Sequence, residues 1–119
     1  MHISKIETIH VNEFSNILFV QIHTNNGLIG LGETYYTPKT ATAFIHEVLA
    51  QQLLGSNPLD IEGHWRRLYD STHVYGNRGT ELRAISAIDV ALWDLFGQHS
   101  GLPLYRALGG ASRKSIRTY

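Results

Sequence analysis

One stretch, residues 84–110, limits what this chain can fold into more than any other. Its large apolar residues recur at three- and four-residue steps, the period of one helical face: Ile85, Ile88, Leu92, Leu95 and Phe96. Thr80 and Glu81 suit a helix start, and Gly101, closely followed by a proline, is a stop signal. The pattern predicts a long, largely buried central helix followed by a short tail over residues 104–108.

The first third of the chain is typical of a small antiparallel sheet. Three stretches are interpreted as strands: residues 3–11, 17–24 and 28–33. Asn25-Asn26-Gly27 between the last two predicts a tight hairpin whose central positions both take positive φ. Gly30 and Gly32 fall on one face of the third strand and leave room for a neighbouring element.

Helical patterns follow the predicted strands. Thr37-Pro38 is an N-cap and first-position proline for a helix that ends near Leu54, and Asn57-Pro58 repeats this start signal. Residues 114–119 have the pattern of a further strand that is cut off. Strands first and helices after predict an α+β fold, a three-stranded antiparallel meander followed by a three-helix bundle on one face.

Composition narrows the classes of function. The chain has 119 residues, enough for one core, and its ten basic residues balance ten acidic ones. Such a balance gives no field to attract nucleic acid or a membrane surface. The sequence has no cysteine, no apolar run of membrane-spanning length and no signal-peptide pattern at its start. These features predict a cytoplasmic protein with neither nucleic-acid nor membrane partners.

The residues alone predict no self-contained catalytic or metal site. His46-Glu47 begins like a zinc-protease motif, but Ala50 stands where the second histidine would be. The seven histidines show no pair at ligand spacing, so surface or capping roles are expected for them. The glycines of residues 27–32 do not match a dinucleotide-binding loop.

The amino-acid sequences of two segments resemble those of a known family. Residues 86–110 contain Asp89-x-Ala91-Leu92-x-Asp94, Leu102-Pro103 and Leu108-Gly109-Gly110. The start of the chain carries Lys5-Ile6-Glu7 and Asn26-Gly27-Leu28-Ile29-Gly30-x-Gly32-Glu33. Together they are similar to the N-terminal domain of the enolase superfamily, in its mandelate racemase/muconate lactonizing enzyme branch.

The resemblance implies a domain organisation. Residues 1–112 would be an enolase-like N-terminal capping domain, and residues 113–119 the start of a (β/α)₈ barrel domain that is absent from this chain. In the family, the barrel holds the Mg²⁺ ligands and the Lys or His bases. The resemblance therefore implies that this chain has no catalytic or metal-ligating residue and is inactive alone.

The activity implied by the resemblance is abstraction of a proton α to a carboxylate. The loop over residues 73–79 resembles that of acid-sugar dehydratases, so a dehydratase (a lyase) or a racemase (an isomerase) of sugar-acid catabolism is expected. The expected partners are the chain's own barrel, a small carboxylate or sugar-acid substrate, and further copies in a homo-oligomer. The alternative is a stand-alone, non-catalytic oligomerisation or binding module with the same fold.

The family's capping loops correspond to residues 12–16 and 34–37. The residues implied to face substrate are Phe14, Tyr35, Tyr36 and Arg78. The residues themselves leave alternatives open, because the tyrosines could pack on the first helix and Arg78 could pair with Asp89 or Asp94. Asp89 needs such a partner most, since it lies at the edge of the apolar arc.

Overall fold

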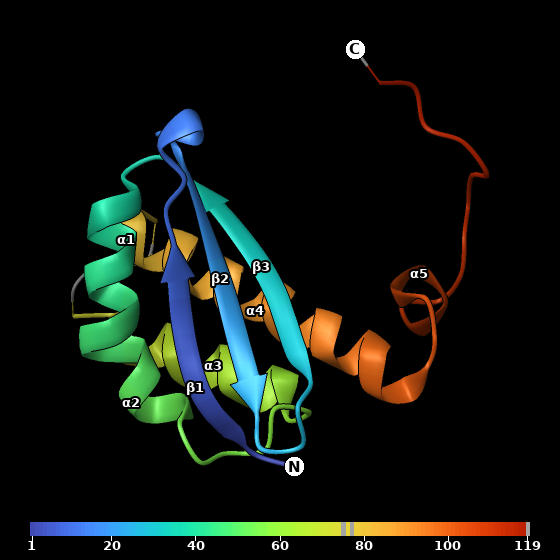
Figure 1. Ribbon diagram of the computed structural model, residues 1–119, viewed down its shortest axis with the longest axis horizontal. Coiled ribbons are helices and arrows are strands. Elements are labelled where there is room, and N and C mark those ends of the chain that lie inside the picture. The colour runs from blue at the N-terminus through green and yellow to red at the C-terminus, as the bar shows by residue number, and fades with distance from the viewer. Residues whose placement is uncertain (75, 77, 119) are drawn as a thin grey trace.

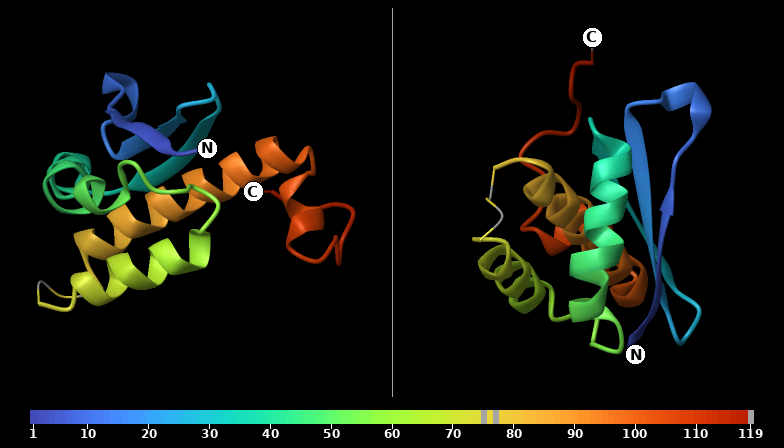
Figure 2. Two further views of the ribbon diagram at one scale, coloured as in Figure 1. Left: turned by 90° about the horizontal axis from the view of Figure 1, so that it is seen from below. Right: turned by 90° about the vertical axis from the view of Figure 1, so that its left-hand side faces the viewer.

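The computed structural model describes residues 1–74, 76 and 78–118. Three antiparallel strands pair in chain order: β1 (Ile3–Ile9), β2 (Ile17–Thr24) and β3 (Ile29–Tyr35). The helical segments are η1 (Asn12–Phe14), α1 (Pro38–Phe44), η2 (Ile45–Leu49), α2 (Ala50–Leu53), α3 (Ile61–Ser71), α4 (Thr80–Ser100) and α5 (Leu104–Ala107). Helices α1 to α4 cover one face of the sheet (Figures 1 and 2). The predicted α+β fold is confirmed.

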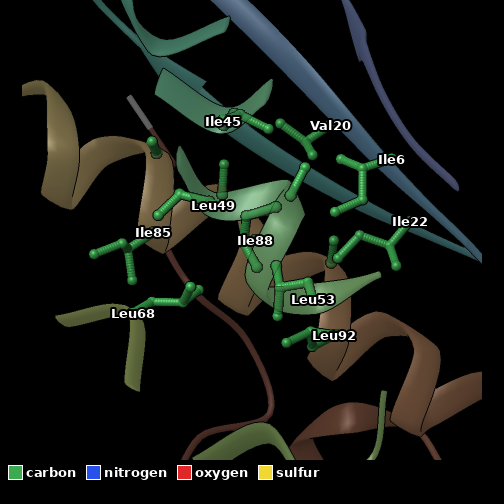
Figure 3. Close-up of a cluster of buried hydrophobic side chains, with 14 of the residues drawn as sticks. Ile6, Val20, Ile22, Ile45, Leu49, Leu53, Leu68, Ile85, Ile88 and Leu92 are labelled. Atoms are coloured by element: carbon green, nitrogen blue, oxygen red, sulfur yellow. The ribbon is translucent and has the colours of Figure 1, made fainter. Parts of the chain in front are cut away.

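The core lies between this face of the sheet and the helices. Every second residue of β2 is buried, and the central helix α4 contributes seven buried residues. Figure 3 shows Ile88 of α4 pointing into the cluster beside Leu49 and Leu53. The fully buried large side chains are Ile3, Leu18, Val20, Ile22, Ile45, Leu49, Leu53, Leu68, Ile85, Ile88, Leu92 and Leu95.

Helix α4 packs directly on strand β3 because that strand carries glycine where the two meet. A Cβ atom added to Gly30 would lie 2.1 Å from the carbonyl oxygen of Ala91, and one added to Gly32 would lie 1.9 Å from that of Ala87. Any side chain there would push the helix away. The predicted close approach is confirmed, with the helix backbone as the neighbour.

Polar side chains of α4 bind the free edge of β3. Asp94 Oδ2 accepts the backbone N–H of Leu31 at 2.8 Å, and Gln98 Nε2 donates to the carbonyl of Ile29 at 2.7 Å. Because β3 is an edge strand, these bonds occupy groups that would otherwise be open to another strand. The helix thus occupies part of this edge of the sheet.

The hairpin between β2 and β3 has a different turn from the predicted one. Thr24 and Leu28 pair across three loop residues, with a 3.0 Å bond from Thr24 N to Leu28 O. Only Gly27 takes a positive φ, +88°, while Asn25 and Asn26 do not. The prediction of two positive φ values was wrong, because the third loop residue lets one glycine reverse the chain.

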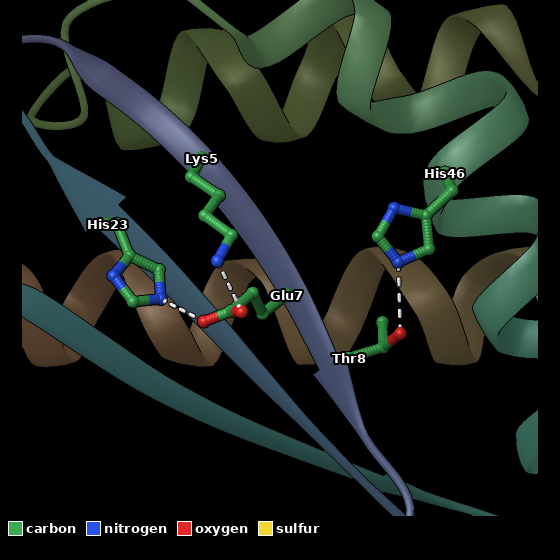
Figure 4. A network of polar contacts seen from close by, with 5 residues as sticks. All are labelled: Lys5, Glu7, Thr8, His23 and His46. Atoms are coloured by element: carbon green, nitrogen blue, oxygen red, sulfur yellow. Dashed lines mark hydrogen bonds and ion pairs between the residues drawn. The ribbon is translucent and has the colours of Figure 1, made fainter.

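The predicted helix from Pro38 is continuous but contains a π segment, η2. Its inward residues keep a constant four-residue spacing: Ala41, Ile45, Leu49 and Leu53. An α-helix would rotate such a row off the core, and the wider π turn keeps it facing inward. Figure 4 shows His46 of η2 in contact with β1, where its Nε2 lies 2.9 Å from Thr8 Oγ1.

Three local predictions were wrong. The helix predicted to start at Asn57-Pro58 is α3, and it begins only at Ile61. A turn precedes it, in which Asn57 Oδ1 accepts the N–H of Leu59. Residues 114–118 form no strand, since no neighbouring strand pairs with them in the described part of the chain; Tyr119 lies outside it. His64 is buried rather than on the surface, and its Nε2 lies 2.7 Å from the carbonyl oxygen of Asn57.

On the outer face of the sheet, charged side chains of β1 and β2 form an ion cluster. Glu7 of β1 contacts Lys5 Nζ, and its Oε2 lies 2.7 Å from His23 Nε2 of β2 (Figure 4). The hydrogen bond from Lys5 is the largest cause that lowers the pKa of the Glu7 carboxyl. The same face exposes Ile29 and Leu31 of β3.

Asp89 makes stability depend on pH. Burial, and then the nearby negative charge of Glu62, raise the pKa of its carboxyl, and it has no hydrogen bond to any described residue. The folded state therefore holds this proton more tightly than the unfolded chain, so the group favours folding at acid pH and opposes it at neutral pH. We expect Asp89→Asn to raise the free energy of unfolding at pH 7, with the gain shrinking as the pH falls and gone below about pH 4. Urea denaturation at both pH values measures this.

The control for this prediction is Asp70→Asn, which removes an exposed carboxylate from α3. It corrects for the general effect of losing one negative charge. A gain for Asp89→Asn that is the same at both pH values, after that correction, would contradict the assignment.

Candidate functional site

One end of the sheet gathers three segments that are far apart in the sequence. They are η1, the connection from β3 to α1 at residues 36–37, and the start of α4 (Figures 1 and 2). The backbone N–H of Tyr36 donates to the carbonyl of Asn16 at 2.8 Å, which joins the first two segments. The two predicted loops therefore lie side by side.

The connection from β3 to α1 is strained. Tyr36 and Thr37 have φ values of 61° and 46°, and they are the only described non-glycine residues with positive φ. Such residues persist only where the surroundings hold them, and they concentrate at functional sites. Thr37 precedes α1 as predicted, but its side chain does not cap that helix; its Oγ1 lies 3.3 Å from Thr80 Oγ1 of α4.

The two predicted tyrosines form a cluster with an arginine of α4. The ring centroids of Tyr35 and Tyr36 lie 4.7 Å apart, and the guanidinium carbon of Arg83 lies 5.1 Å from each centroid. Arg83 Nη1 also donates to the carbonyl of Tyr35 at 3.2 Å. Both tyrosines are about half exposed, at 53% and 52%, so they lie at the surface and not within the core.

A surface pocket of about 320 Å³ adjoins this cluster. It lies between the end of β3 and the start of α4, and its lining residues are Glu33, Thr34, Tyr35, Arg78, Gly79, Leu82, Arg83 and Ser86. The structure thus brings together two predicted site residues, Tyr35 and Arg78. It adds the carboxylate of Glu33, the hydroxyls of Thr34 and Ser86, and the second guanidinium, that of Arg83, around the same space.

Arg78 is placed by the first turn of α4. Glu81 Oε1 accepts the backbone N–H groups of Arg78, at 3.0 Å, and of Gly79, at 2.8 Å. Hydrogen bonds from backbone N–H groups, first its own and then that of Gly79, lower the pKa of the Glu81 carboxyl. The Arg78 side chain has no ion pair with Asp89 or Asp94 in the described part of the chain, so that alternative is wrong.

Two of the four predicted site residues, Phe14 and Tyr36, do not line this pocket. Phe14 is 56% exposed on η1 and does not line it. A second pocket, of about 390 Å³, lies between residues that flank η1 and the start of α1, and includes His10, Ser15 and Lys39. The loop expected over residues 73–79 is described only in part, since Tyr75 and Asn77 lie outside the described residues.

Sequence reasoning missed Arg83 as a site residue. The helical period places it on the polar side of α4, three residues after Thr80, which is one turn along the same face. Its contact with Tyr35 joins residues 48 positions apart, and nothing in the local pattern reports that distance. Only the packing of α4 along β3 brings them together.

The residues present do not fit a magnesium site. Among residues 1–74, 76 and 78–118, no three His, Asp or Glu side chains lie together in a group that could hold a metal ion. A carboxylate set is the usual requirement for Mg²⁺.

None of the helices that the structure describes has both the length and the hydrophobicity needed to cross a bilayer.

Comparison with known proteins decides the family. The sequence model of the mandelate racemase/muconate lactonizing enzyme N-terminal domain matches residues 4–109. The chain belongs to this family. A D-galactonate dehydratase family member from Pseudarthrobacter chlorophenolicus is 39% identical over 107 residues, which are 87% of this chain and 26% of that protein.

Further relatives of this N-terminal domain agree. D-galactarolactone cycloisomerase from Agrobacterium fabrum is 36% identical over 102 residues, 86% of this chain and 27% of that protein. The crystal structure of an enolase of the mandelate racemase subgroup from Agrobacterium tumefaciens matches with a TM-score of 0.90 and 40% identity, over 100% of this chain and 32% of that one. This chain spans about a quarter to a third of the length of these relatives.

Proposed function

We propose that this domain covers the active site of a magnesium-dependent enzyme that abstracts the proton α to the carboxylate of a sugar acid. Dehydration is the outcome we favour, because sugar-acid dehydratases recur among the relatives. In this proposal the metal ligands and the bases belong to a barrel domain, which the relatives' greater length accommodates. The domain contributes binding and exclusion of water rather than proton transfer.

The observation that carries the proposal is the grouping around the 320 Å³ pocket. Arg78 presents a guanidinium whose planar fork suits a carboxylate or neighbouring hydroxyls. The carboxylate oxygens of Glu33 can accept hydrogen bonds from hydroxyl groups. Tyr35 supplies an aromatic wall with a hydroxyl at its end. A polyhydroxylated carboxylate needs this combination of donor, acceptor and flat surface.

Phe14 and Tyr36 belong to the same proposal as flanking residues. Each is exposed at this end of the sheet, and the Tyr36–Asn16 hydrogen bond keeps the two loops together. We propose that they narrow the opening from the sides, while Tyr35 and Arg78 face the substrate. A stand-alone oligomerisation module is not favoured, since the relatives are enzymes.

The tail offers a surface for the rest of such an enzyme. Residues 101–118 extend away from the sheet and helices (Figure 1), and they expose apolar side chains on and around α5. These are Leu102, Leu104, Tyr105, Leu108 and Ile116. Several exposed apolar residues in one segment suit contact with another protein part, and we propose the barrel as that part. Assembly into a homo-oligomer stays a prediction.

The proposal is tested by exchange of the α-proton of aldonic acids with solvent deuterium in the presence of Mg²⁺. We expect no exchange above background with this 119-residue chain, and exchange with a polypeptide that joins it to a family barrel. Exchange catalysed by the chain alone would overturn the proposal, because the described residues would then hold the catalytic groups.

The binding role has its own variant. In the joined polypeptide we expect Arg78→Met to raise KM by about tenfold or more, the cost of one charge-assisted hydrogen bond, with a smaller effect on kcat. Arg66→Met is the matched control, since Arg66 is exposed on α3 and does not line the pocket. Equal KM values for the two variants would remove Arg78 from the site.

A further inference from the structure

We infer that Arg83 is a positioning residue that holds Tyr35, which lines the pocket, and its neighbour Tyr36 in the conformation seen here. The inference rests on the proposed function for its importance to substrate choice, but its geometry stands on this chain alone. Arg83 comes from the second turn of α4, whereas the tyrosines end β3 and begin the connection to α1.

Arg83 contacts both the aromatic rings and the backbone of the loop. Its guanidinium carbon lies 5.1 Å from both ring centroids, within the range of cation–π attraction, and the two rings are tilted by 44°. Its Nη1 donates to the backbone carbonyl of Tyr35 at 3.2 Å. One planar group therefore fixes both the side chains and the backbone at the end of β3.

The loop needs such a restraint because its backbone is strained. Tyr36 and Thr37 are consecutive left-handed residues, and each costs about 1–3 kcal/mol unless contacts compensate for it. Two further tethers act on the same residues: Asn16 accepts the N–H of Tyr36, and Thr80 lies 3.3 Å from the Thr37 hydroxyl. Two of the three restraints, Thr80 and Arg83, come from the start of α4.

The consequence concerns specificity. A loop held in this way forms a fixed wall before substrate arrives, rather than a lid that closes afterwards. Arg83 lines the pocket beside Tyr35 and Arg78, so its loss would let the wall relax without removing either substrate-facing side chain. Arg83 thus sets the shape that the substrate meets.

The test compares Arg83→Met, Arg83→Lys and Arg66→Met in this chain by amide hydrogen exchange and NMR. We expect Arg83→Met to speed exchange of the Tyr36 N–H about tenfold or more, while the N–H groups of Val20 and Ile22 in β2 keep the wild-type rate. Arg83→Lys should give an intermediate rate, because an ammonium group keeps the positive charge but lacks the planar fork that contacts both rings and the carbonyl together. Arg66→Met should resemble the wild type at every site.

Each contrary result is informative. Unchanged Tyr36 exchange in Arg83→Met would overturn the inference, and so would equal acceleration in β2, which would mean general loss of stability. In the polypeptide joined to a barrel, the same variant should raise KM more than it lowers kcat. Faster Tyr36 exchange with an unchanged KM would support the inference that Arg83 restrains the loop. It would refute the loop's role in the proposed function.

Discussion

Gly32→Ala should lower the free energy of unfolding by about 3 kcal/mol or more, or prevent folding. The added methyl group would lie 1.9 Å from the carbonyl oxygen of Ala87 and 3.0 Å from the amide nitrogen of Ala91. These are backbone atoms of the central helix, so no side-chain rotation relieves the overlap. Helix α4 would have to move off β3, and urea denaturation followed by circular dichroism measures the cost.

Gly63→Ala is the matched control, since it makes the same chemical change in open space. Gly63 lies within α3, and outside its chain neighbours and the backbone of its own helix no heavy atom stands within 4 Å of an added Cβ. Alanine should there stabilise the domain by about 0.5–1 kcal/mol, because it forms helix more readily than glycine. If both variants changed stability alike, direct contact between α4 and β3 would be refuted.

Ile88→Ala should destabilise the domain by about 2–5 kcal/mol, the cost of removing a buried side chain and leaving a cavity. Ile88 is 1% exposed and lies at the centre of the cluster that joins β2, η2, α2 and α4 (Figure 3). Val90 stands two residues further along the same helix and is 48% exposed, so Val90→Ala should cost less than about 0.5 kcal/mol.

Urea denaturation also compares the free energies of unfolding of these two variants. Similar losses for Ile88→Ala and Val90→Ala would mean that the inward face of α4 has been assigned wrongly. A changed denaturant slope would instead indicate that the variant no longer unfolds in one step.

Much of the fold could be predicted because several local signals agree. The apolar period of residues 84–96, the αL glycine at Gly101 and the paired glycines of β3 all point to a helix lying on a sheet. Element boundaries were less predictable. The start of α3 depends on how Asn57 folds its own turn, and the π segment on how four inward residues meet the core.

The site could be predicted only in part. Tyr35 and Arg78 were expected from the family resemblance, and the structure brings both to one pocket. Arg83 could not be predicted, since its contacts depend on how α4 lies along β3. His64 was expected in a surface or capping role, yet the turn before α3 buries it against the carbonyl of Asn57.

The support of one loop by a distant helix bears on attempts to alter substrate preference. Transplanting residues 35–37 from a relative would import new side chains but leave them resting on Thr80 and Arg83 of the recipient. A successful exchange would have to carry both segments together, even though more than forty positions separate them. In natural variation and in design alike, residues 35–37 and the start of α4 are therefore expected to change together.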